Sequence, residues 1–362
     1  VNNSATGYLQ LTDNNAEGAL LANVLTDGGT GSAWKVAVFN FRADDVQPYS
    51  VPIIGTMEAG STMTLSVKDS YRFPVKAANA GLLCGAMEEN AQLTLEHYEQ
   101  IAEKETGYFI KDASGAGGGL VGKMGKGAAL TVEPNLTFPE KTIQAAGGAG
   151  DLVGEMGENA TLTVSGSLTC AGIINAGSGG SLVGQMGKNA QVTVKGNLAL
   201  NVTEVKTSSG AGGGLVGEMG ESAALTVSGS LTCAGKINAG GSGGSLVGQM
   251  GKNAQATVTG GLTLNVTEVT AGGSAGGLVG KMAEGSALSL PETKELTVQT
   301  NLSGSNAGGL VGEMKDGARL SGLSGTAKVT VSGTVKATQN AGGLIGLGEN
   351  LVLDGGMPEV TA

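Results

Sequence analysis

The sequence predicts an all-β fold: a right-handed parallel β-helix, or solenoid, of about ten coils of 30–37 residues with three short strands in each coil. Three observations support this prediction. A short motif recurs at a near-constant interval, each repeat alternates apolar and polar residues as strands do, and the last 224 residues contain no aromatic residue.

The recurring motif is an apolar pair followed by Gly, any residue and Met. It begins at Ile53 and ends in a degenerate "LIGLG" at Leu344, which has no methionine. Consecutive methionines of the motif are 30 to 37 residues apart, at Met57, Met87, Met124, Met156, Met186, Met219, Met250, Met282 and Met314. Such a period is typical of stacked repeats.

Two glycine-rich stretches resemble nucleotide-binding loops. Gly117, Gly122 and Lys123 have the spacing of a Walker A loop, but Met124 stands where Ser or Thr should hold magnesium. "GGGLVG" from Gly212 has the spacing of a dinucleotide fingerprint. A nucleotide site occurs once or twice in a chain, whereas this motif occurs ten times, so we interpret both stretches as structural.

Residues 151–175, "DLVGEMGENATLTVSGSLTCAGIIN", show the expected organisation of one coil. "LVGEM", "ATLTVS" and "SLTCA" are β-favouring runs separated by Gly, Asn or Ser, which predicts three strands and three turns. Period-two alternation points Leu152, Met156, Leu162 and Val164 inward and Glu155 outward. With coils about 4.8 Å apart, ten rungs give a core roughly 43 Å long.

One apolar column does not follow this alternation, because simple pleating would turn it outward. A bulge at the following Gly would bring the column inside, which we favour; otherwise it forms an exposed apolar stripe of the kind that marks an interface. The column consists of Ile54, Cys84, Val121, Val153, Val183, Val216, Val247, Val279, Val311 and Ile345.

Two columns of residues that follow the methionine predict the turns. The residue two positions after Met alternates in charge, so that adjacent coils place opposite charges side by side: Glu89, Lys126, Glu158, Lys188, Glu221, Lys252 and Glu284, with Asp316 last. The next column holds left-handed turn residues, with Asn90, Asn159, Asn189 and Asn253 among glycines and a serine.

A two-coil duplication relates the stretch from Glu155 to the stretch from Glu218 and carries Cys170 to Cys233. Two coils span roughly 9.6 Å, beyond the roughly 7 Å limit for a disulfide between Cα atoms. We therefore expect these cysteines, together with Cys84, to be buried free thiols.

Composition narrows the function. There are 66 glycines without the triplet period of collagen, and all eleven aromatic residues lie at or before Phe138. The formal charge of −10 comes without a basic patch, which argues against a nucleic-acid partner. No apolar run predicts a transmembrane segment, and "VNNSATGYLQ" lacks a signal-peptide pattern, so we expect a removed signal or an excerpt of a longer chain.

The expected domains are an N-terminal cap region (1–50), the solenoid (51–348) and a C-terminal tail (349–362) that leads to further domains. An insertion at about 96–116 is expected to form a short helix or a loop, most simply packed on the flank of a coil. Insertions on one face are where repeat proteins often bind, so its side chains His97, Tyr98, Tyr108 and Phe109 are the candidate partner-binding residues.

The recurring Gly-Leu-Val-Gly, as in Gly119 to Gly122 and Gly214 to Gly217, resembles the GLUG motif of bacterial secreted and cell-surface proteins. The resemblance covers roughly residues 51–348. It implies an adhesin-like β-solenoid outside the cell, on the bacterial surface or wall, and it transfers no catalytic residues. The expected partner is then a protein or glycan surface ligand.

Three functional classes follow. We favour a non-catalytic structural or adhesive module, which can also self-associate laterally or end to end, and we predict no cofactor or metal because calcium-binding repeat patterns are absent. A polysaccharide-acting enzyme is the first alternative, although the coils offer no convergent carboxylates. The second is an ice-binding face on the outward file Thr94, Thr131, Thr163, Thr193, Thr226 and Thr257, whose flanks mix Gln191, Ala224, Gln255 and Lys195.

Overall fold

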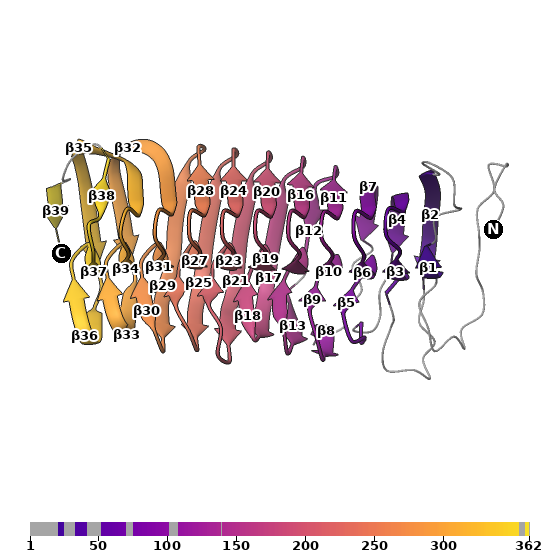
Figure 1. The fold of residues 1–362 in the computed structure, drawn as a ribbon, viewed down its shortest axis with the longest axis horizontal. Helices are drawn as coiled ribbons and strands as arrows, with labels where there is room; N and C mark the ends of the chain where they lie inside the picture. Colours follow the sequence, from indigo (N-terminus) through magenta and orange to yellow (C-terminus); the bar gives the residue numbers. More distant parts are fainter. Residues whose placement is uncertain are drawn as a thin grey trace.

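The computed structural model describes residues 21–24, 33–41, 52–69, 75–100, 108–138, 140–354 and 359–361. All secondary structure in this part of the chain is β, and the coils stack side by side along the long axis of the molecule (Figure 1). The strands lie in three sheets, and each strand pairs in parallel with the corresponding strand of the neighbouring coils. The predicted parallel β-solenoid is therefore confirmed.

The first sheet contains the recurring motif. Ten of its eleven strands are the ten predicted rungs, and β1 adds one more at the N-terminal end. In order they are β1 (Leu21–Val24), β3 (Ile54–Met57), β6 (Cys84–Met87), β10 (Val121–Met124), β15 (Val153–Met156), β19 (Val183–Met186), β23 (Val216–Met219), β27 (Val247–Met250), β31 (Val279–Met282), β34 (Val311–Met314) and β37 (Ile345–Gly348).

The second sheet follows the turn after the methionine. Its strands alternate between buried apolar residues and outward polar residues, as in β16, where Leu162 and Val164 are 1 % exposed. The strands are β2 (Ala33–Phe41), β4 (Thr62–Asp69), β7 (Gln92–Gln100), β11 (Ala129–Val132), β16 (Thr161–Val164), β20 (Gln191–Val194), β24 (Ala224–Val227), β28 (Gln255–Val258), β32 (Ala287–Gln299), β35 (Arg319–Ser332) and β38 (Val352–Leu353), with β39 (Glu359–Thr361) also paired to β35.

The third sheet takes two strands from each regular coil, which refines the prediction of one. The first is a longer strand: β8 (Tyr108–Ala113), β12 (Leu136–Thr137) with β13 (Lys141–Ala145), β17 (Leu168–Ala176), β21 (Leu198–Thr207), β25 (Leu231–Ala239) and β29 (Leu262–Ala271). The second is a short strand rich in glycine: β5 (Ala80–Gly81), β9 (Gly117–Gly118), β14 (Gly148–Gly150), β18 (Ser178–Gly180), β22 (Gly212–Gly213), β26 (Gly243–Gly244) and β30 (Ser274–Gly276). In the last coils both parts merge into β33 (Asn301–Gly308) and β36 (Val335–Gly342).

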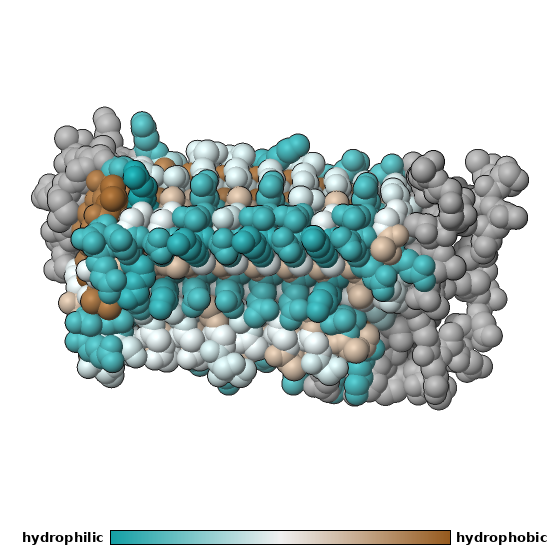
Figure 2. All heavy atoms as spheres, viewed as in Figure 1, coloured by the Kyte–Doolittle hydropathy of each residue, from teal (hydrophilic) through white to brown (hydrophobic). Residues whose placement is uncertain are grey.

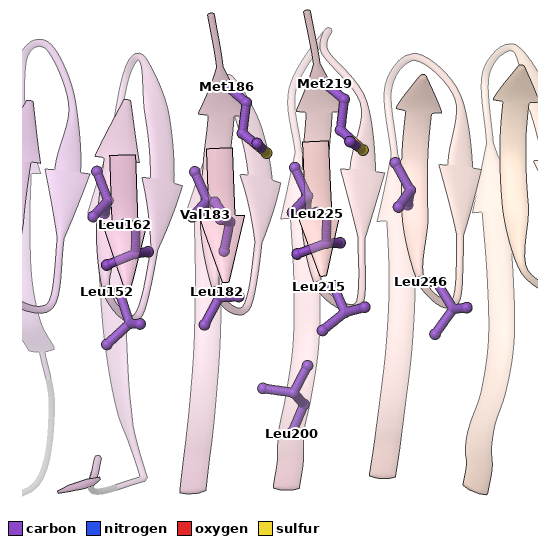
Figure 3. Packing of buried hydrophobic residues seen from close by; sticks show 14 of the residues in the cluster. Leu152, Leu162, Leu182, Val183, Met186, Leu200, Leu215, Met219, Leu225 and Leu246 are labelled. Carbon is purple, nitrogen blue, oxygen red and sulfur yellow. The ribbon is translucent and has the colours of Figure 1, made fainter. Parts of the chain in front are cut away.

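The core is a continuous column of aliphatic side chains that neighbouring coils share (Figure 3). The uncertain apolar column is buried: Val121, Val153 and Val183 are 0 % exposed, which rules out an exposed stripe there. Ile345, in the last coil, is partly exposed. Burial of the column, which we favoured, is therefore confirmed for the inner coils.

Glycine explains why this column is covered. A Cβ on Gly154 would stand 2.7 Å from the amide nitrogen of Gly117 on β9 and 2.8 Å from the carbonyl oxygen of Gly148 on β14. The short glycine strands therefore press directly on the first sheet, backbone against backbone. Because protein covers both sides of the strand at this point, Val153 is buried although simple pleating would turn it outward.

The turns after the methionines have the predicted conformation. Asn90, Asn159, Asn189 and Asn253 have φ between 55° and 57°, in the left-handed region that Asn tolerates better than most residues. Ser222 occupies the same column with φ 56°. Asn189 Nδ2 donates a hydrogen bond of 3.1 Å to Asn159 Oδ1, so the turns of these coils are joined to each other.

Three regional predictions change or gain detail. The insertion does not begin with a helix or a loop: residues 96–100 complete β7, where Tyr98 pairs with Val67 and packs on the core, while residues 101–107 lie outside the described chain. Most of the predicted cap (1–50) is also outside it, but β1 and β2 extend the first two sheets. In the predicted tail, β38 and β39 both pair with β35.

Candidate functional surfaces

The four candidate partner-binding residues fall on two sheets. His97 and Tyr98 lie on β7 in the second sheet; His97 is exposed, whereas Tyr98 is partly buried against the core. Tyr108 and Phe109 lie on β8 in the third sheet, and their side chains are outside the described part. His97 is thus the one of the four whose described side chain is exposed.

The Gly-Leu-Val-Gly motif is built into the sheet and leaves no cradle for a phosphate. The amide groups that would face a phosphate instead donate to the next coil: Gly119 N to Gly150 O at 3.0 Å, and Leu120 N to Leu152 O at 3.0 Å. Lys123 is 3.7 Å from Glu155. The structure therefore supports the structural interpretation of this motif.

Charged side chains form rows along the rod. Figure 2 shows hydrophilic rows that run parallel to the long axis. In the predicted alternating column, Lys188 Nζ lies 3.1 Å from Glu221, and Lys252 Nζ lies 3.1 Å from Glu284. These side chains are about half exposed, so each pair contributes roughly 0.2–1 kcal/mol. The rows favour in-register stacking of the coils and offer a surface that repeats along the axis.

A more buried polar cluster surrounds Glu313 on β34, whose side chain is only 10 % exposed. Ser274 Oγ donates to Glu313 Oε2 at 2.9 Å, and the Nζ atoms of Lys281 and Lys315 lie 3.4 Å and 3.1 Å from Oε1. Burial alone would raise the pKa of Glu313, but the hydrogen bonds from Lys315 and Ser274 and the two positive charges outweigh it and lower that pKa. This carboxylate is fully partnered, which favours a structural role.

Asp151 is the residue that the sequence interpretation missed. It follows β14 at a position that is Gly in several other coils, it is 4 % exposed, and its side chain hydrogen-bonds with Cys170. One carboxylate oxygen, Oδ2, has no partner. Burial raises the pKa of Asp151 to about 7. The sequence signal that could have revealed Asp151 was an Asp directly before Leu-Val-Gly, at a position where several other coils have Gly.

The three cysteines are buried and free, as predicted. Leu200 lies between Cys170 and Cys233 in the sheet, which confirms that the two thiols are two coils apart. Burial raises the pKa of the Cys233 thiol to about 12 and that of Cys84 to about 12. Neither thiol is ionised near neutral pH, so both act as small apolar side chains.

The outward threonine file is in register along the second sheet. Each threonine of the predicted file pairs with the next, and the file extends beyond the prediction to Thr64 at one end and to Ser289 and Ser321 at the other. The neighbouring outward column mixes Gln191, Ala224 and Gln255, as the sequence indicated. The flank is therefore a regular hydroxyl row beside an irregular one.

Among the described residues, no group of three or more His, Cys, Asp or Glu side chains is placed to hold a metal ion. This part of the chain also has no helix that could cross a membrane. No family model matches the chain, and no curated protein or solved structure matches it significantly.

Proposed function

We propose that the protein is a non-catalytic structural or adhesive module: a rod-like β-solenoid of a bacterial surface protein, outside the cell, that presents a flank to a protein or glycan partner. The GLUG-type motif supports the family and the location. The observation that carries the proposal is the continuous parallel pairing of the first and second sheets, from β1 and β2 to β37 and β38. Such stacking makes a stiff body whose outer surface repeats from coil to coil.

Repetition suits a repetitive ligand. A row of equivalent side chains about 4.8 Å apart can engage successive units of one extended partner, and many weak contacts then add up to stable attachment. The hydroxyl file around Thr163 and Thr193 is the most regular outward row of the second sheet. It supplies hydrogen-bond donors and acceptors without a net charge, which suits the hydroxyl groups of a glycan.

The same file supports a second candidate function, binding to ice. Its in-register extension from Thr64 to Ser321 favours this alternative, because an ice surface requires a long, regular array of hydroxyl groups. The neighbouring mixed column weakens it, since a flat second file is missing.

One set of variants tests both functions. Thr163→Lys combined with Thr193→Lys places two long charged side chains on the hydroxyl flank, and Asn201→Lys, which is exposed on the long strand β21, is the matched control. We expect the wild-type protein and the control to bind on a glycan array, and we expect the affinity of the double variant to fall by at least about tenfold. Inhibition of ice recrystallisation that the double variant loses would favour the ice-binding alternative.

His97→Ala is a separate arm of the same experiment, because His97 is exposed on β7 but lies three residues after Thr94 and is not part of the hydroxyl file. Loss of binding in this variant alone would move the partner site to the insertion. Absence of glycan, protein and ice binding in the wild-type protein would overturn the adhesive part of the proposal.

A further inference from the structure

The C-terminal end of the rod exposes strand edges. The first sheet ends at β37 and the second-sheet path ends at β38, and within the described residues each of these strands pairs on one side only. An unpaired edge carries a row of free backbone donors and acceptors and is a template for another strand.

The same end exposes apolar side chains. Leu344, Ile345 and Leu353 are partly exposed, whereas their counterparts one coil earlier are at most 1 % exposed. Together with Leu310 and Leu323 they line a small apolar depression. Figure 2 shows hydrophobic residues gathered at this end of the molecule. The inner coils cover such residues with the next coil, so this surface has the shape and chemistry that accept one more coil.

The N-terminal end offers matching strands. The first sheet begins at β1 and the second at β2, and both lie in the same columns as the inner coils. Leu21 lies in the column that ends at Ile345, and Trp34 lies in the column that ends at Leu353. If a second copy were shifted along the rod axis, apolar register positions would therefore meet apolar ones in both sheets.

We propose that the C-terminal edge, β37 and β38, docks the N-terminal edge, β1 and β2, of a second copy of this chain, so that the molecules stack head to tail. The parallel pairing of both sheets decides the orientation, because only a head-to-tail copy continues parallel strands and the established columns. A tail-to-tail dimer would pair the edges antiparallel. The proposed contact is heterologous, and when it repeats it builds an open filament rather than a closed dimer. It requires no ligand on the flank and is independent of the proposed function.

The first test is the oligomeric state. Sedimentation velocity of the full chain over a range of concentrations should show a series of growing species, and electron microscopy should show rods whose lengths are multiples of one molecule. Ile345→Lys and Leu353→Lys place a charge on the docking edge and should raise the concentration needed for assembly by about tenfold or more. Asn201→Lys, on the flank of a middle coil, should leave assembly unchanged. A wild-type protein that stays monomeric at all concentrations would overturn the proposal.

The second test fixes the orientation and does not depend on the edge variants folding well. Asn23 and Leu347 lie in one column of the first sheet, so head-to-tail docking brings them onto neighbouring strands. Neighbouring strands are about 4.8 Å apart, within the range that a disulfide spans. A mixture of Asn23→Cys and Leu347→Cys should form the mixed disulfide under mild oxidation, whereas the native cysteines are buried and do not interfere. A disulfide between two Leu347→Cys chains alone would show tail-to-tail docking and would contradict the proposal.

Discussion

Two coils of the rod have nearly the same sequence and differ at one buried position. The coil with β15, β16 and β17 and the coil with β23, β24 and β25 have strands of the same lengths, and Cys170 and Cys233 occupy the same place in each. In Figure 3, Leu152 and Leu215 occupy equivalent positions. The first coil has Asp151 where the second has Gly214.

The comparison shows that the shared residues determine the strands, whereas the one differing buried residue changes the electrostatics of the core. The strands have the same lengths in both coils because the columns of Leu, Val, Gly and Met that they share determine them. A Cβ on Gly214 would clash with the carbonyl oxygen of Ser245, so the second coil leaves no room for a side chain at this position. The first coil accommodates Asp151, whose side chain hydrogen-bonds with Cys170. Of the two coils, only the first therefore buries a carboxyl group here.

The largest expected effect is the pH response of this carboxyl group. The folded-state pKa of Asp151, about 7, lies above its ordinary value of 3.8, so folding favours the protonated carboxyl group. Its stabilising contribution is complete below about pH 4 and is lost as the pH rises to about 7, which amounts to roughly 4 kcal/mol. Asp151→Gly copies the second coil and should remove this dependence.

Chemical denaturation of the wild-type protein and of Asp151→Gly at pH 4 and pH 8 measures the effect. The difference in unfolding free energy between the two proteins should change by about 4 kcal/mol between these pH values, in favour of the variant at pH 8. Taking the difference cancels the opposite contribution of Glu313, whose pKa is lowered. A difference that does not change with pH would show that Asp151 is not neutral in the core.

The second prediction concerns the close backbone contact at glycine that both coils share. Gly154→Ala and Gly217→Ala should each lower the free energy of unfolding by about 3 kcal/mol, because the added methyl group would meet backbone atoms at 2.6 Å in both coils. Gly261→Ala is the matched control, since the nearest atom to its Cβ would be 3.7 Å away. Thermal melts should rank the control close to the wild-type protein. Equal stability of all three variants would mean that the glycine strands can move apart.

The third prediction uses the turn where the coils differ by Asn159 and Ser222. Both residues have positive φ, but Asn tolerates this conformation better than Ser. Asn159→Ala should lower the free energy of unfolding by about 1 kcal/mol, and Ser222→Gly should raise it by about 0.5 kcal/mol. Denaturation midpoints report both changes, and destabilisation by Ser222→Gly would contradict this explanation of the turn.

The smallest expected effect concerns the coil between the two, where Lys188 lies 3.1 Å from Glu221. Lys188→Gln should lower the free energy of unfolding by about 0.5 kcal/mol at low salt and by close to nothing at 1 M salt, because both side chains are about half exposed. Unfolding curves at the two salt concentrations measure this. An effect that persists at high salt would indicate lost packing rather than lost charge.

Much of the fold was predictable from local patterns. The position of each rung, the turn conformation of Asn159 and the opposite charges of Lys188 and Glu221 all follow from a fixed interval between residues, because stacked coils turn sequence spacing into spatial neighbours. The free thiols of Cys170 and Cys233 follow from the same interval. The candidate binding residues were less predictable: the strand pairing that fixes Tyr98 joins β7 to β4, and no sequence interval shows that this pairing continues into the insertion.

By itself the sequence determined the repeat length, the sheet-forming segments and the order in which side chains stack, since these depend on periodicity alone. Tertiary structure decided the burial of Val153 and of Asp151. Both depend on the short glycine strands, which cover the first sheet only when successive coils bring backbone against backbone. The repeat period relates only equivalent positions of successive coils. It does not reveal this contact, which joins different positions of the repeat and requires glycine, a residue without a side chain.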